Sequence, residues 1–149
     1  MSFSFTLSTF NLSVFPMTYR FEFDQANKIL LLRFEGRRLT DELGSEIYWA
    51  IKQYSTATNA GAGIWDFSAA IEFALSPEFI RGLADREPAM PDAAKRPRFF
   101  VAPATVGLGM SRLFEIAVGD RNPLFKIVHS VEDAFVALGL QSPQFEPLG

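Results

Sequence analysis

The sequence predicts an α/β domain in which helices cover a mixed, mainly parallel sheet. Two observations predict this class. Short apolar strands alternate with segments of helical periodicity from Ile29 onward. A hairpin opens the chain, and right-handed crossovers then place the later strands parallel to one another. The expected order of elements is β-β-α-β-α-β-α-β-α, with the helices packed on the sheet.

The first two strands are predicted from alternation and from an aliphatic run. Residues 19–24 (YRFEFD) alternate apolar and polar side chains, which is typical of a half-buried strand. Residues 29–34 (ILLLRF) begin with four consecutive aliphatic residues, which indicates a strand covered on both faces. Residues 25–28 (QANK) between them are the predicted turn of a hairpin, which Gly36 closes.

A helix and a third strand follow the hairpin. Thr40 is a suitable N-cap, and the first turn after it carries two acidic residues, which the helix dipole favours. Apolar residues then recur at helical spacing until residues 59–63 (NAGAG) end the helix. Residues 64–67 (IWDF) form the predicted third strand, with Asp66 at its carboxyl end.

The second half of the chain continues the alternation of helices and strands. Ser76 followed by Pro77 marks a helix start, because a capping hydroxyl precedes a proline at the first helical position. Residues 98–102 (RFFVA) and 124–128 (LFKIV) are predicted strands. A glycine-containing turn leads the first of these strands into an apolar-faced helix, and Ser130 caps the last helix.

The 149 residues fit one domain. The chain is predicted to divide into an uncharged N-terminal extension outside the core (residues 1–16), the domain itself (residues 17–140) and an irregular tail (residues 141–149). The extension alternates Ser, Thr and Phe. Such an apolar alternation can add to a sheet edge and favour a homodimer.

Composition excludes several classes of function. The absence of cysteine excludes disulfides, zinc–thiolate sites and cysteine nucleophiles, and it is compatible with a cytoplasmic location. A net charge of -3 gives no general attraction to nucleic acid, and no apolar run is long enough to span a bilayer. His129 is the only histidine, and no Gly-x-Ser-x-Gly elbow occurs, so no catalytic triad is expected. We therefore expect no enzymatic activity, no cofactor and no metal site.

Four motifs occur in a set order along the chain. They are a hairpin strand that ends in glycine (residues 31–36, LLRFEG), a strand that ends in aspartate (residues 65–68, WDFS), a Gly-x-x-Arg helix start (residues 109–115, GMSRLFE) and the opening of the last helix (residues 131–135, VEDAF). In this order and spacing they resemble the STAS/SEC14-like family of small bacterial proteins, also called SpoIIAA-like. The resemblance covers residues 18–140 and implies a STAS/SpoIIAA-like α/β fold.

The resemblance also implies a regulatory role. The better understood relatives are anti-sigma-factor antagonists, which bind a kinase partner and are switched by phosphorylation of a serine. The corresponding region here is residues 71–76, where Ser76 supplies the hydroxyl. The acidic residue and the glycine of the family turn are missing, which argues against a phospho-switch and favours Ser76 as an N-cap.

Candidate binding residues lie where strands end and helices begin. Asp66 and Ser68 follow a parallel strand, at the edge where open α/β sheets bind ligands, although Asp66 can equally cap the following loop. Gly107 and Gly109 permit a tight turn, and Arg112 behind them can capture an anion or pair with a neighbouring carboxylate. The expected contact residues are Asp66, Ser68, Ser76, Gly107, Gly109 and Arg112.

Two functions remain open from the sequence. The first is a non-enzymatic domain for regulatory protein–protein interaction, in the manner of an anti-sigma-factor antagonist. The second, suggested by the lipid-binding side of the family, is binding of a small apolar or anionic ligand in a crevice beside residues 107–112. The sixteen phenylalanines fit that ligand site, but they are more typical of a dense core.

Overall fold

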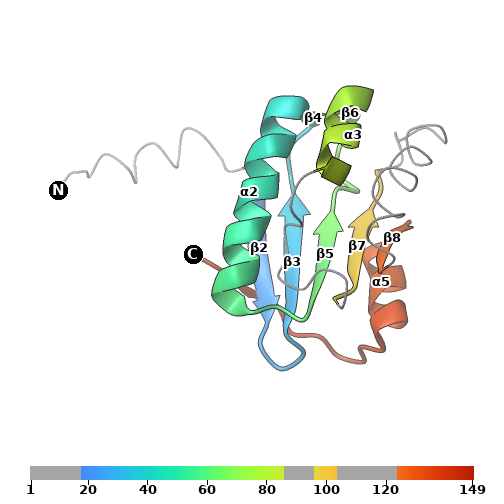
Figure 1. The fold of residues 1–149 in the computed structure, drawn as a ribbon. Helices are drawn as coiled ribbons and strands as arrows, with labels where there is room; N and C mark the ends of the chain where they lie inside the picture. Colours follow the sequence, from blue (N-terminus) through green and yellow to red (C-terminus); the bar gives the residue numbers. More distant parts are fainter. Residues whose placement is uncertain (1–17, 86–95, 104–123) are drawn as a thin grey trace, which may run out of the picture.

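The computed structural model describes residues 18–85, 96–103 and 124–149, and its centre is a six-stranded sheet (Figure 1). The strands are β2 (Tyr19–Asp24), β3 (Ile29–Phe34), β5 (Ala62–Asp66), β7 (Arg98–Val101), β8 (Phe125–Val128) and β9 (Glu146–Pro147). Their order across the sheet is β8-β7-β5-β3-β2-β9. β3, β5, β7 and β8 are parallel, whereas β2 runs antiparallel to both of its neighbours. The mixed, mainly parallel sheet predicted from the sequence is confirmed.

The hairpin of β2 and β3 has the predicted bounds. Tyr19 lies opposite Phe34, and Asp24 lies opposite Ile29 at the turn. Lys28 ends the turn with a φ of 59°, a left-handed conformation that suits the reversal of the chain. The three leucines of β3 are fully buried, because both faces of this central strand are covered.

In the described part of the chain, three helices cover the two faces of the sheet (Figure 1). α2 (Asp41–Thr58) and α3 (Pro77–Asp85) lie on one face, and α5 (Val131–Leu138) lies on the other. Alternate strand residues enter two separate cores. The core under α2 and α3 includes Phe21, Phe23, Leu30, Leu32, Phe34, Trp65, Phe67 and Phe100. The core under α5 includes Ile29, Leu31, Ala62, Ile64, Phe99 and Val101.

Local capping explains why the helices begin and end where they do. Thr40 Oγ1 accepts a hydrogen bond from Leu43 N at 3.3 Å, and Ser130 Oγ accepts one from Asp133 N at 3.0 Å. α2 ends at Asn59, whose φ of 51° is the left-handed conformation common at helix ends. The predicted N-caps of the first and last helices are therefore confirmed.

The structure contains three short strands that the sequence analysis did not predict. β4 (Arg38–Thr40) and β6 (Glu72–Ala74) form a separate two-stranded parallel sheet directly before α2 and α3. β9 lies within residues 141–149, for which we predicted an irregular tail, and it pairs with β2. Strands of two or three residues carry no readable alternation, so only their tertiary pairing defines them.

The glycine-rich residues 59–63 are more than a turn. β5 begins at Ala62, so Gly63 lies within a central strand rather than before it. A side chain at Gly63 would overlap the indole ring of Trp65, which lies directly over this position. The glycine therefore makes room for the ring.

Two predicted segments lie outside the described residues. They are the N-terminal extension (residues 1–16) and the helix expected to begin near Gly109. Among the described helices, none is both long and apolar enough to cross a membrane.

Candidate functional site

Charged side chains form a strip across the α5 face of the sheet, near the carboxyl ends of β3 and β5. We call Arg20, Glu22, Arg33, Glu35 and Asp66 the charged strip. These positions alternate along the strands with residues of the core under α2 and α3, so they share the opposite face. Arg33 is the register partner of both Arg20 on β2 and Asp66 on β5. Pairing of the strands therefore brings together residues that are far apart in the sequence.

Opposite charges alternate along the strip. Glu22 Oε2 lies 3.0 Å from Arg20 Nη1 and 3.3 Å from Arg33 Nε. Arg33 Nη1 lies 3.6 Å from Asp66 Oδ2, and Arg20 Nε lies 3.3 Å from Glu35 Oε2. The side chains of Glu22 and Asp66 are only 10% and 12% exposed, so each of these carboxylates is desolvated beside a cation. The two arginines lie directly opposite each other, and Glu22 offsets their repulsion.

The predicted site residues Asp66 and Ser68 are in contact. Asp66 Oδ1 accepts a hydrogen bond from Ser68 N at 3.0 Å and another from Ser68 Oγ at 2.6 Å. These bonds close a turn of the Asx type directly after β5. Of the two roles that the sequence left open for Asp66, capping of the following loop is the one visible in these hydrogen bonds.

Ser76 is not part of the charged strip. It lies between the starts of α2 and α3. Its Oγ accepts a hydrogen bond from Phe79 N at 3.0 Å, which confirms the predicted N-cap. The same hydroxyl donates to Asp41 Oδ2 at 2.7 Å, and Ser76 N donates to Asp41 Oδ1 at 2.8 Å. Ser76 thus joins α3 to the first turn of α2, and a phosphate on its hydroxyl would be repelled by the adjacent Asp41 carboxylate.

Gly107, Gly109 and Arg112, the remaining predicted site residues, lie outside the described residues. The sequence analysis in turn missed Arg33 and Glu22. For Arg33 the signal was present, because a charged residue in a strand that is otherwise apolar and covered on both faces needs a partner. What the sequence could not supply was the register that identifies this partner.

A second feature lies on the outer face of α2. Trp49 is 54% exposed there, although the indole is one of the largest apolar side chains. The ring of Tyr48 meets the indole edge-on with 5.6 Å between centroids, and Lys52 Nζ lies 5.3 Å from the indole centroid. We call Tyr48, Trp49 and Lys52 the Trp49 patch. The other exposed residues of α2 are Glu42, Glu46, Gln53, Thr56 and Ala57, so Trp49 is the one large apolar side chain exposed on this helix.

A hydrogen bond from β2 fixes one side of this helix face. Tyr19 on β2 donates its hydroxyl proton to Glu46 Oε2 at 2.6 Å. Burial, followed by this bond to a carboxylate, raises the pKa of Tyr19 to about 12. Tyr19 therefore stays protonated at neutral pH and holds Glu46 close to the start of β2.

Within residues 18–85, 96–103 and 124–149, no three His, Cys, Asp or Glu residues gather closely enough to hold a metal ion. Comparison of the chain with protein-family models finds no match, and comparison with curated protein sequences finds none either. The charged strip, the Ser76 contacts and the Trp49 patch are the features of the described residues that bear on function.

Proposed function

We propose that this domain is a STAS-like, non-enzymatic module for regulatory protein–protein interaction, and that its partner contacts the Trp49 patch. The exposed indole of Trp49 carries the proposal. Tryptophan is enriched among the few interface residues that supply most of the binding energy, because it buries a large apolar area. Tyr48 and Lys52 contact the ring, which lowers the entropy cost of fixing it in a complex.

The charges around the patch define the kind of partner. Glu46 and Glu42 share the outer face of α2 with Trp49, and they lie respectively one and two turns closer to the N-terminus of the helix. The whole chain also carries a net charge of -3. A protein surface that offers an apolar pocket for the indole, with basic side chains beside it, is complementary to this face.

The internal contacts of the sequence-predicted residues support a non-enzymatic role. Asp66 holds Ser68 with one oxygen and faces Arg33 with the other. Ser76 is held by Asp41 and caps α3. These side chains have structural tasks that account for their positions, so we move the proposed partner contact from them to α2.

The STAS-like assignment is supported by the order of elements. A hairpin is followed by strands that alternate with helices, and Asp66 ends the third strand of the main sheet, as the family pattern implies. The alternative, a ligand crevice beside residues 107–112, rests on residues outside the described part of the chain. No contact among the described residues favours it over protein binding.

Affinity capture from the source cells tests the proposal. The bait is the full chain, and Trp49→Glu is compared with Val136→Glu, a matched charge introduced at a residue of α5 that is 79% exposed. We expect a specific partner on the wild-type and Val136→Glu baits, and about thirtyfold weaker binding to Trp49→Glu, the loss of a strong hot spot. A partner held equally by Trp49→Glu, or no specific partner at all, would contradict the proposal.

A further inference from the structure

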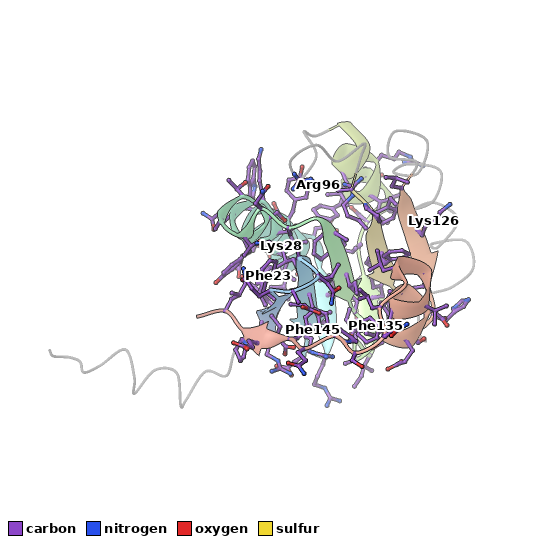
Figure 2. The ribbon with its side chains drawn as sticks, turned by 90° about the horizontal axis from the view of Figure 1, so that it is seen from below. Phe23, Lys28, Arg96, Lys126, Phe135 and Phe145 are labelled. Carbon is purple, nitrogen blue, oxygen red and sulfur yellow. The ribbon has the colours of Figure 1, made fainter. Side chains whose placement is uncertain are left out.

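The last residues of the chain close one edge of the sheet. We call residues 140–149 the C-terminal strap. It leaves α5, crosses the lower end of the α5 face of the sheet and reaches β2 at the opposite edge, as Figure 2 shows. β9, within the strap, places Glu146 opposite Phe23 and Pro147 opposite Glu22. The edge strand of the main sheet is thus supplied by a terminal segment.

The hydrogen bonds show which backbone groups of β2 face this edge. Leu148 N donates to Phe21 O at 2.9 Å. Because backbone groups alternate in direction along a strand, Tyr19 and Phe23 direct theirs to the same side as Phe21. Among the described residues, β9 pairs with Glu22 and Phe23 and Leu148 reaches Phe21, so the outer edge of β2 extends past this segment at Tyr19.

Apolar side chains of the strap pack on both sides of the sheet, and Leu140 and Phe145 pack against the core under α5. Phe145 stacks on Phe135 of α5 with ring centroids 5.9 Å apart, and the two rings lie together in Figure 2. Leu148 packs against the core under α2 and α3. The strap therefore contributes to both cores through few contacts. A segment that pairs with the β2 edge needs apolar side chains at the positions of Phe145 and Leu148.

A buried carboxylate provides a preformed anchor at the end of this edge. Asp24 is 1% exposed, and its Oδ2 accepts a hydrogen bond from Gln144 N of the strap at 3.2 Å. The same carboxylate accepts bonds from Asn27 N at 3.1 Å and Asn27 Nδ2 at 2.9 Å. Because the hairpin turn orients Asp24, the acceptor for Gln144 is in place whether or not the strap is bound.

We propose that the outer edge of β2, with Asp24 at its end, is a strand-docking site that the strap fills within its own chain and that the strap of a second copy can fill in exchange. The strap of a second copy fits this site because its sequence is identical and it makes the same contacts. A terminal segment with so few hydrogen bonds opens at much lower cost than a core strand. Gln141 and Ser142, both exposed, lie where the strap would hinge.

Pro147 prevents the assembly from growing through the free edge of β9. It lies opposite Glu22, whose backbone groups face β3, so the nitrogen of Pro147 points to the free edge of β9. A proline nitrogen carries no hydrogen to donate, and the free edge of β9 therefore resists addition of a further strand. Exchange of straps satisfies both docking sites and leaves no additional open edge.

Shortening the hinge tests the exchange. Deleting Gln141 and Ser142 removes roughly 7 Å of reach, at about 3.3–3.6 Å per residue. We expect size-exclusion chromatography with light scattering to show a dimeric mass for this variant. The same deletion combined with Phe145→Ser and Leu148→Ser should stay monomeric. A folded monomer for the first variant, or a dimer for both, would overturn the proposal.

A peptide-binding experiment tests the same docking site without the deletion. The full-length variant Phe145→Ser/Leu148→Ser retains the β2 edge but carries a strap that competes poorly. We expect it to bind a labelled peptide of residues 140–149 saturably in fluorescence anisotropy, and at least about tenfold more tightly than a peptide with the same two serines. Absence of saturable binding, or equal binding of both peptides, overturns the proposal. Trp49→Glu should change neither experiment, which separates this site from the proposed partner surface.

Discussion

Replacing Asp24 with asparagine should destabilise the domain strongly, although the side chain keeps its shape. Asp24 is 1% exposed and accepts hydrogen bonds from Asn27 and Gln144. In the asparagine variant one carboxylate oxygen becomes an NH₂ group, which cannot accept a bond. If this group replaces Oδ2, it faces two donors, Asn27 Nδ2 and Gln144 N.

The size of this effect follows from the bonds that are lost. A hydrogen bond to a charged group contributes about 1.5–3 kcal/mol, and Asn27 Nδ2 can turn toward water, which recovers part of the loss. We expect the free energy of unfolding at pH 7 to fall by about 2–4 kcal/mol. Urea denaturation followed by tryptophan fluorescence measures it, and Glu146→Gln on the exposed side of β9 is the control, with a change below about 0.5 kcal/mol.

The effect of Asp24→Asn should also depend on pH. Burial alone would raise the pKa of Asp24, but the hydrogen bonds from Asn27, Gln144 and Ala26 outweigh it and lower the pKa. A lowered folded-state pKa stabilises the protein above the unfolded pKa of about 3.9, and this stabilisation is lost as the pH falls through the folded pKa. The difference between wild type and variant should therefore shrink in acid. An unchanged difference from pH 7 to pH 3, or none at pH 7, would refute this account of Asp24.

Three further substitutions test the packing and the charged strip. Gly63→Ala overlaps the Trp65 indole, so it should cost about 1–3 kcal/mol of stability and shift the tryptophan emission. Ser76→Ala removes the cap of α3 and its bond to Asp41, so it should cost about 1–2 kcal/mol in urea denaturation. Arg33→Met leaves two nearly buried carboxylates of the charged strip without their shared cation, which should cost about 1–3 kcal/mol in the same assay.

Two control substitutions make the same chemical change at positions where the structure predicts little effect on stability. An added methyl group at Gly82 meets nothing within 4 Å, so Gly82→Ala on α3 should be neutral or stabilising where Gly63→Ala is not. Lys126→Met on β8 removes an exposed cation and should change stability by less than about 0.5 kcal/mol, in contrast to Arg33→Met. If a substitution and its control lowered the free energy of unfolding by similar amounts, the proposed contacts would not govern stability.

Features encoded by neighbouring residues were predicted well from the sequence. The hairpin follows from an alternating strand, an aliphatic strand and the polar turn between them. The N-cap roles of Thr40, Ser76 and Ser130 follow from hydroxyls placed directly before helical periodicity. Each of these signals lies within a few residues of the structure that it specifies, which is why no tertiary information was needed.

Features that depend on distant residues were not predicted. The pairing of Arg38 with Glu72 that defines β4 and β6 joins segments separated by the whole of α2. Asp66 was recognised as a strand-end carboxylate, but its approach to Arg33 depends on the register of β3 and β5. The contact of Ser76 with Asp41 likewise depends on how α3 packs beside α2. Periodicity contains none of this information.

The two tryptophans allow a direct test of the proposed partner surface. Trp49 is 54% exposed and Trp65 is 6% exposed, so Trp65 is an internal control for unfolding. Hydroxyl-radical footprinting with mass spectrometry compares their oxidation in the purified protein and in the source cells. We predict that Trp49 is oxidised in the purified protein and protected in the cells, while Trp65 is protected in both. Equal oxidation of Trp49 in both settings would contradict a partner bound at the Trp49 patch.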